Sequence, residues 1–89
     1  MADLSKPRVL LVDDEPDLLA AMVRNLRSEH FELGTAGGPV EALEMLRNRG
    51  PFAVIVSDLR MPVMDGVALL SQARKVSPDT VREIGRAHV

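Results

Sequence analysis

The sequence has no cysteine, tryptophan or tyrosine, and its only aromatic residues are Phe31 and Phe52. Without cysteine the chain can form neither disulfides nor thiolate metal sites, which is compatible with a reducing compartment, so we expect a cytoplasmic protein. So few aromatic side chains provide no stacking platform for single-stranded nucleic acid. The net charge of -2 leaves no basic stripe for phosphates. We therefore predict that nucleic acid is not a partner of this segment.

Long apolar runs are also absent. The apolar run at residues 9–12 ends at Asp13 and Asp14, and it is too short for a signal peptide or a membrane span. We therefore predict no membrane role. A length of 89 residues with 46% hydrophobic residues is typical of one small soluble domain.

The apolar residues alternate between strand-like runs and helical spacing. We expect strands at residues 8–12, 31–35 and 52–56, and the start of a fourth at Thr80 and Val81. Between them we expect helices at residues 16–28, 38–49 and 67–76. Alternation with short connections predicts parallel strands joined by right-handed crossovers, so the fold class is α/β.

Acidic residues follow two of the predicted strands. Asp13 and Asp14 come after the first strand, and Asp58 comes after the third. Ligands of open parallel sheets bind beyond the carboxyl ends of the strands, so these three carboxylates converge if the two strands are neighbours. Clustered like charges repel, and a bound cation is the usual resolution. Ligands that are all oxygen suit Mg²⁺ or Mn²⁺.

Two motifs, VLLVDDEPD from Val9 and VIVSDLRMPVMDG from Val54, resemble the response-regulator receiver domain of two-component signalling. The resemblance covers residues 7–82. It implies a flavodoxin-like, doubly wound parallel sheet that is truncated after the third helix, with strand order 2-1-3 in the part present. It also implies a signalling domain rather than a conventional enzyme, with a sensor histidine kinase as phosphoryl donor and an output domain beyond the C-terminus.

The resemblance assigns roles to individual residues. Asp58 is the phosphoacceptor, a carboxylate nucleophile that forms an acyl phosphate. Asp14 and Asp58 bind Mg²⁺ directly, the backbone carbonyl of Arg60 supplies a third ligand, and Asp13 acts through water. We assign Asp65 no chemistry, because an Asp-Gly pair is typical of a turn and a helix start.

The same residues allow other interpretations. Asp13 and Asp14 alone could cap the following helix. A haloacid-dehalogenase-type phosphatase needs two aspartates separated by one residue after the first strand, and this sequence has none there. A P-loop ATPase needs a glycine-rich phosphate-binding loop, which is also missing. A calcium loop at residues 13–17 is excluded because the required glycine is absent. A receiver-like interaction domain that is never phosphorylated remains the alternative.

The end of the chain departs from the family pattern. The family has a hydroxyl residue after the fourth strand and a lysine after the fifth, and both are missing here. The two lysines of the chain, Lys6 and Lys75, lie at the opposite edge of the predicted sheet from Asp58. Residues 83–89 show no strand or helix period and read like a translated sequencing-library adapter. We therefore predict a tail at residues 1–6, a partial receiver at residues 7–82 and a non-native tail at residues 83–89. Because the chain stops as the fourth strand begins, we expect the third strand to form an unpaired apolar edge, and the fragment alone to be inactive and prone to aggregation.

Overall fold

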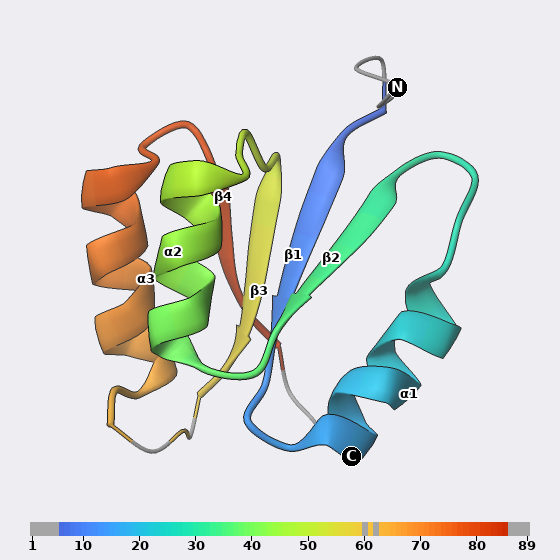
Figure 1. Ribbon diagram of the computed structural model, residues 1–89, viewed down its shortest axis with the longest axis horizontal. Coiled ribbons are helices and arrows are strands. Elements are labelled where there is room, and N and C mark those ends of the chain that lie inside the picture. Colours follow the sequence, from blue (N-terminus) through green and yellow to red (C-terminus); the bar gives the residue numbers. More distant parts are fainter. Residues whose placement is uncertain (1–5, 60, 62, 86–89) are drawn as a thin grey trace.

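The computed structural model describes residues 6–59, 61 and 63–85, which form a parallel sheet with helices on both faces (Figure 1). The elements in chain order are β1 (Arg8–Val12), α1 (Pro16–Leu26), β2 (Glu32–Ala36), α2 (Pro39–Asn48), β3 (Val54–Asp58), α3 (Gly66–Val76) and β4 (Val81–Gly85). The strand order is β2-β1-β3-β4, and every pair is parallel. The predicted α/β class and the 2-1-3 order are confirmed.

Most boundaries differ from the predicted ones by one or two residues. Helix α1 ends at Leu26 because a local turn follows, in which the backbone N–H of His30 donates to Ser28 Oγ at 3.0 Å. Strand β3 begins at Val54 rather than at Phe52. The carbonyl of Phe52 lies outside the strand ladder because it accepts a hydrogen bond from Thr80 Oγ1 at 2.7 Å.

The fourth strand is longer than the sequence predicts. Residues 83–85, whose side chains show no strand pattern, complete β4, and Glu83 pairs with Val56 while Gly85 pairs with Asp58. The expectation of an unpaired edge at β3 is therefore wrong, and β4 is the edge strand instead. The physical reason is that backbone groups of β3 can pair with any extended segment of suitable length, whatever its side-chain pattern. The origin of residues 83–89 stays a prediction.

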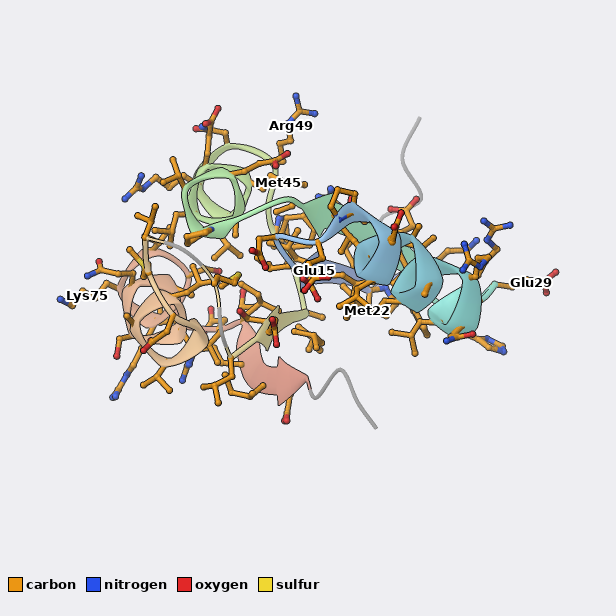
Figure 2. All side chains as sticks on the ribbon, turned by 90° about the horizontal axis from the view of Figure 1, so that it is seen from below. Glu15, Met22, Glu29, Met45, Arg49 and Lys75 are labelled. Atoms are coloured by element: carbon orange, nitrogen blue, oxygen red, sulfur yellow. The ribbon has the colours of Figure 1, made fainter. Side chains whose placement is uncertain are left out.

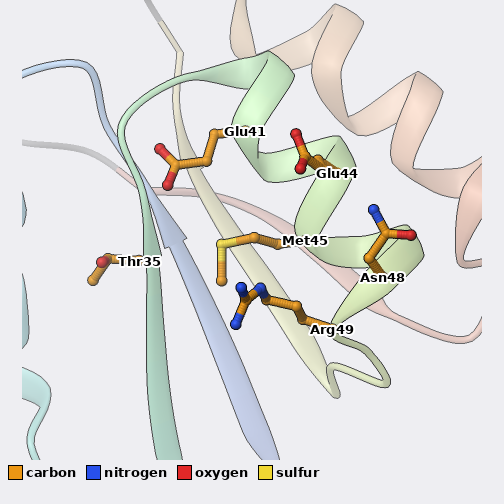
Figure 3. Close-up of a pocket in the computed structure, with 6 residues that line it drawn as sticks. All are labelled: Thr35, Glu41, Glu44, Met45, Asn48 and Arg49. Carbon is orange, nitrogen blue, oxygen red and sulfur yellow. The ribbon is translucent and has the colours of Figure 1, made fainter.

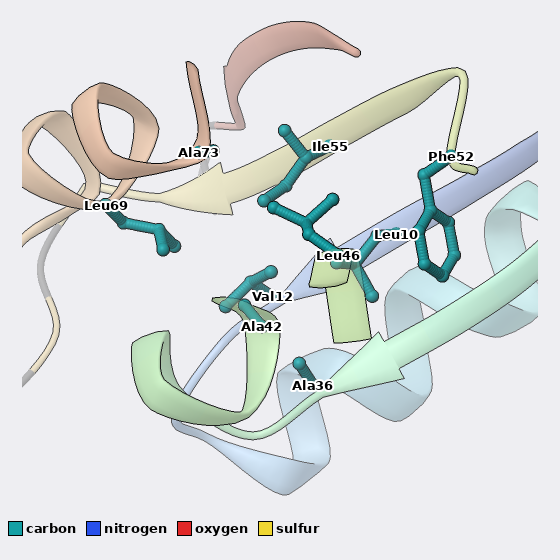
Figure 4. Packing of buried hydrophobic residues seen from close by; sticks show 9 residues of the cluster. All are labelled: Leu10, Val12, Ala36, Ala42, Leu46, Phe52, Ile55, Leu69 and Ala73. Carbon is teal, nitrogen blue, oxygen red and sulfur yellow. The ribbon is translucent and has the colours of Figure 1, made fainter. Parts of the chain in front are cut away.

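The main hydrophobic core lies between the sheet and the pair α2 and α3 (Figure 4). Its fully buried sheet residues include Leu10 and Ile55, which face each other across β1 and β3. Helix α3 contributes Leu69 and Ala73, which have no exposed surface. Helix α3 packs against β3 and β4, so two neighbouring strands hold it against the sheet.

Helix α1 covers only part of the other face of the sheet (Figure 1). It packs against β1, yet none of its residues is buried. On β4, Val81 is 54% exposed. The β3 and β4 side of this face therefore lies largely open among the described residues. Among the described residues, no helix is long and apolar enough to cross a membrane.

A buried hydroxyl joins the end of the sheet that lies away from the acidic residues. Thr80 is 2% exposed, and its Oγ1 donates to the carbonyl of Phe52 at 2.7 Å and lies 2.6 Å from Ser77 Oγ. The hydroxyl thus connects the turn before β4 to the segment before β3. Removing it would leave a buried carbonyl without this partner.

We predict that Thr80→Val lowers the free energy of unfolding by about 1–3 kcal/mol, because valine keeps the shape but leaves buried polar groups unpaired. Urea unfolding would measure the change. Thr35→Val is the matched control, since Thr35 is exposed on the edge strand β2, and it should change stability little. Equal stabilities for the two variants would contradict this role of the Thr80 hydroxyl.

Candidate functional site

The acidic residues meet at the carboxyl ends of β1 and β3. These two strands are neighbours, and the chain leaves β1 for α1 on one face of the sheet and β3 for α3 on the other (Figure 1). Such a divergence opens a crevice where ligands of parallel sheets bind. One carboxylate oxygen each from Asp13, Asp14 and Asp58 lies within 4.8 Å of the other two. The structure therefore brings together the three acids that the sequence singled out.

The three acids differ in their surroundings. Asp13 is only 2% exposed, whereas Asp14 and Asp58 are half-buried. The backbone N–H of Asp13 donates to the carbonyl of Ala36 at 3.2 Å, and its Oδ1 accepts from the backbone N–H of Glu15 at 3.0 Å. Figure 2 looks onto this end of the molecule, with Glu15 near the centre of the view. Asp13 thus forms the fixed floor of the site, and the other two acids line its open side.

Burial is the main reason that the pKa of Asp13 lies above its usual value, and the charges of Asp58 and Asp14 raise it further. The hydrogen bond from the backbone N–H of Glu15 acts in the opposite direction. The ionised form of Asp13 is therefore disfavoured in the folded protein. A cation at the site would reverse this balance.

The donor set fits a hard divalent cation. Three carboxylates offer only oxygen ligands, and two of them are partly open, which leaves room for water. Across residues 6–59, 61 and 63–85, no Lys or Arg side chain pairs with any of the three acids. The cluster therefore has no basic counterpart in the part of the chain that the structure describes. Arg60, whose carbonyl the resemblance implies as a ligand, lies outside the described residues.

Asp65 begins a helix, as the sequence indicated. It is the N-cap of α3, and its side chain accepts a hydrogen bond from the backbone N–H of Ala68 at 2.8 Å.

The loop before α3 contains Val63, which has a φ of 74° and is 91% exposed. A β-branched residue seldom adopts this left-handed conformation, and nothing in the local sequence indicated it.

Two further residues beside Asp58 were not identified from the sequence. Ser57 is fully buried and donates its hydroxyl to the carbonyl of Asp58, and Gly66 packs against that same carbonyl. The Asp-Gly pair signalled a turn at Asp65, but no sequence signal linked Gly66 to a strand end several residues away. Only the folded chain brings these groups together.

A separate hollow of about 280 Å³ lies between β2 and α2 (Figure 3). Its walls are Thr35, Glu41, Glu44, Met45, Asn48 and Arg49. None of these residues belongs to the acidic cluster, and Glu41 is engaged by the backbone N–H of Gly37 at 2.8 Å. This hollow is therefore distinct from the site.

We predict that Asp13→Asn raises the free energy of unfolding near pH 7 in the absence of divalent metal. The unfolded chain loses the Asp13 proton near pH 3.8, but the folded protein loses it at higher pH, so wild-type stability falls as pH rises through that interval. Asparagine removes this penalty and keeps an acceptor for Glu15. The gain should disappear as pH drops toward 3.8.

Urea unfolding in a metal chelator, repeated from acid to neutral pH, would measure the effect. Asp79→Asn is the matched control, since Asp79 is exposed in the turn before β4. A stability difference between Asp13→Asn and wild type that does not depend on pH would contradict the assigned cause.

Comparisons with known proteins agree with this geometry. Residues 9–84 match the model of the response regulator receiver domain. The transcriptional regulatory protein PrrA of Mycobacterium tuberculosis is 41% identical over 76 residues, which are 85% of this chain and 32% of PrrA. The sensor kinase CckA of Brucella abortus is 43% identical over 72 residues, 80% of this chain and 8% of CckA. The chain thus spans about a third or less of these relatives.

Solved structures show the same fold. An adenylate cyclase from Rhodopirellula baltica superposes with a TM-score of 0.83 and 40% identity, covering 89% of this chain and 58% of that one. A CheY-like response regulator receiver domain protein from Methanospirillum hungatei superposes with a TM-score of 0.82 and 30% identity, covering 96% of this chain and 69% of that one. The acids at the carboxyl ends of β1 and β3, the strand order and these matches lead to one conclusion: the chain belongs to the response regulator receiver domain family.

Proposed function

We propose that the chain is the phosphoacceptor part of a response regulator and that Asp58 receives the phosphoryl group. The observation that carries the proposal is the convergence of three carboxylates within 4.8 Å without a basic partner among the described residues. Of the three, Asp58 ends β3 and is half-buried, so its carboxylate is both held by the sheet and open to a donor. Asp13 is too deeply buried to meet a second protein.

In the proposed reaction, a carboxylate oxygen of Asp58 attacks the phosphorus of a phosphohistidine on the donor kinase. An oxygen–phosphorus bond forms, the phosphorus–nitrogen bond breaks, and the electron pair returns to the imidazole nitrogen. The product is an acyl phosphate. Transfer of this kind depends on positioning and on neutralisation of negative charge more than on covalent assistance.

Mg²⁺, or Mn²⁺ in its place, is the cofactor that this donor set suits. Asp14 and Asp58 would bind the ion directly, Asp13 would act through water, and the carbonyl of Arg60 would complete the protein ligands. When bound, the ion would offset the charge of the carboxylates and of the phosphoryl oxygens. The acids of this chain would hold the ion beside the nucleophilic carboxylate of Asp58.

The output of the parent protein is not encoded in these residues. The relatives named above include a transcriptional regulator, a sensor kinase and an adenylate cyclase, so the similarity extends to the receiver and not to a shared output. We propose a sensor histidine kinase as the donor and an output domain further along the parent chain. A matching kinase would dock over the open side of the acidic site.

We also propose that the 89 residues alone support little phosphorylation. Residues 86–89 contain no serine, threonine or lysine, and the family supplies a hydroxyl and a lysine from segments beyond β4. The matched structures are longer than this chain, which covers 58% and 69% of the two named above. Tests of phosphorylation therefore need a receiver completed with the downstream residues of its gene.

We predict that the completed receiver gains one hydroxylamine-labile phosphoryl group when it is incubated with Mg²⁺ and acetyl phosphate. Asp58→Asn should abolish this labelling, because the amide cannot form an acyl phosphate. Intact-mass spectrometry before and after hydroxylamine would count the groups. Asp79→Asn should label like wild type, since Asp79 lies at the other end of the sheet.

Hydroxylamine-labile labelling that persists in Asp58→Asn would refute the phosphoacceptor assignment. A wild-type protein that folds, binds Mg²⁺ and is never labelled would favour the alternative, a receiver-like interaction domain.

A second prediction concerns the metal. Asp14→Ala should weaken Mg²⁺ binding about tenfold or more, because it removes a direct ligand. In the absence of metal it should leave the fold intact or slightly more stable, because it relieves repulsion within the cluster. Calorimetric titration with MgCl₂ would measure the affinity, and Asp17→Ala, an exposed acid in the first turn of α1, is the control. Unchanged affinity in Asp14→Ala would place the metal elsewhere.

A further inference from the structure

The peptide that carries Asp58 is held on one side by the preceding residue. Ser57 has no exposed surface, and its side chain points toward the α2 and α3 layer with its register partner Val12. Its Oγ donates to the carbonyl oxygen of Asp58 at 2.9 Å. A hydroxyl at a fully buried position of a strand costs stability unless it is hydrogen-bonded. Here its partner is the backbone of the proposed nucleophile.

The same peptide is held on its other side by the first residue of α3. A Cβ atom on Gly66 would lie 2.4 Å from the carbonyl oxygen of Asp58 and 3.0 Å from the Cα atom of Leu59. The backbone N–H of Gly66 also donates to the carbonyl of Leu59 at 2.8 Å. Only a residue without a side chain fits this close approach.

Space, and not backbone conformation, requires the glycine at position 66. Among the described residues no glycine has a positive φ, so Gly66 is not there to permit a left-handed turn. Gly38 is the N-cap of α2, one position earlier than Gly66 stands in α3, and a Cβ atom added there would meet nothing within 4 Å apart from its chain neighbours. The tight contact therefore distinguishes the start of α3 from the start of α2.

Helix α3 is itself anchored in the core, so the contact of Gly66 with the Asp58 carbonyl fixes that carbonyl relative to the core. Leu69 and Ala73 are fully buried against the sheet, and Asp65 caps the first turn through Ala68. Gly66 thus cannot move away without displacing the helix. The carbonyl of Asp58 lies between a fixed helix start and a buried hydroxyl.

We propose that Ser57 and Gly66 are positioning residues that set the direction of the Asp58 carboxylate toward Asp13 and Asp14. The proposal rests on the proposed function, because it concerns the same nucleophile. The side chain of Asp58 leaves the backbone next to the clamped peptide, so a rotation of that peptide swings the carboxylate away from its partners. A displacement of about 1 Å at a reacting group can cost on the order of 100-fold in rate.

The test compares Ser57→Ala and Gly66→Ala in the completed receiver. We expect Ser57→Ala to slow acetyl phosphate labelling about fivefold at saturating Mg²⁺, the equivalent of one lost hydrogen bond. We expect Gly66→Ala to slow it on the order of 100-fold. The matched controls are Ser71→Ala, an exposed serine on α3, and Gly38→Ala, and both should label at the wild-type rate.

Thermal melting of each variant separates positioning from stability. The proposal requires that Ser57→Ala label slowly while its melting temperature stays within a few degrees of wild type. If Gly66→Ala does not fold, Ser57→Ala alone decides. Labelling of Ser57→Ala at the rate of Ser71→Ala would overturn the proposal while leaving Asp58 as phosphoacceptor. A wild-type receiver that is not labelled would instead refute the proposed function, and the positioning role with it.

Discussion

The site depends on the parallel pairing of β1 with β3. Their register sets Val12 opposite Ser57, so the residues that follow, Asp13 and Asp58, emerge side by side at the same edge of the sheet. A slip of one residue would turn every side chain of β3 to the other face, because side chains alternate along a strand. Asp58 would then point toward the layer of α2 and α3. The buried pair Leu10 and Ile55 opposes such a slip, because the slip would move the apolar side chain of Ile55 out of the core.

The core and the acidic cluster act in opposite directions on stability. Burial of apolar side chains between the sheet and α2 and α3 favours folding, whereas three clustered carboxylates with no basic partner among the described residues disfavour it. The acids stand at the end of the two most enclosed strands, where the backbone is held on both sides. A rigid sheet can hold these like charges near one another, because the packing of the core offsets their repulsion.

The helices cover the two faces of the sheet unequally. Helices α2 and α3 cover one face and enclose the core, while α1 covers the other face only beside β1 and leaves Val81 of β4 half-exposed. Among the described residues, β4 is also an edge of the sheet, with no strand paired on its outer side. The acidic site therefore lies within the well-packed part of the fold, and the open part of the sheet lies beside β3 and β4.

The succession of strands and helices along the chain, the acids of the site and the helix start at Asp65 could be predicted from the sequence, because these depend on local periodicity and on residue chemistry. The sequence did not determine the extent of β4, since Glu83 and Gly85 become strand only through pairing with β3. Tertiary structure alone decided the clamp on Asp58, because the contact joins Gly66 to a strand end across a loop. Whether Gly66 meets the end of β3 depends on how α3 packs on the sheet. No pattern of neighbouring residues in the sequence predicts that packing.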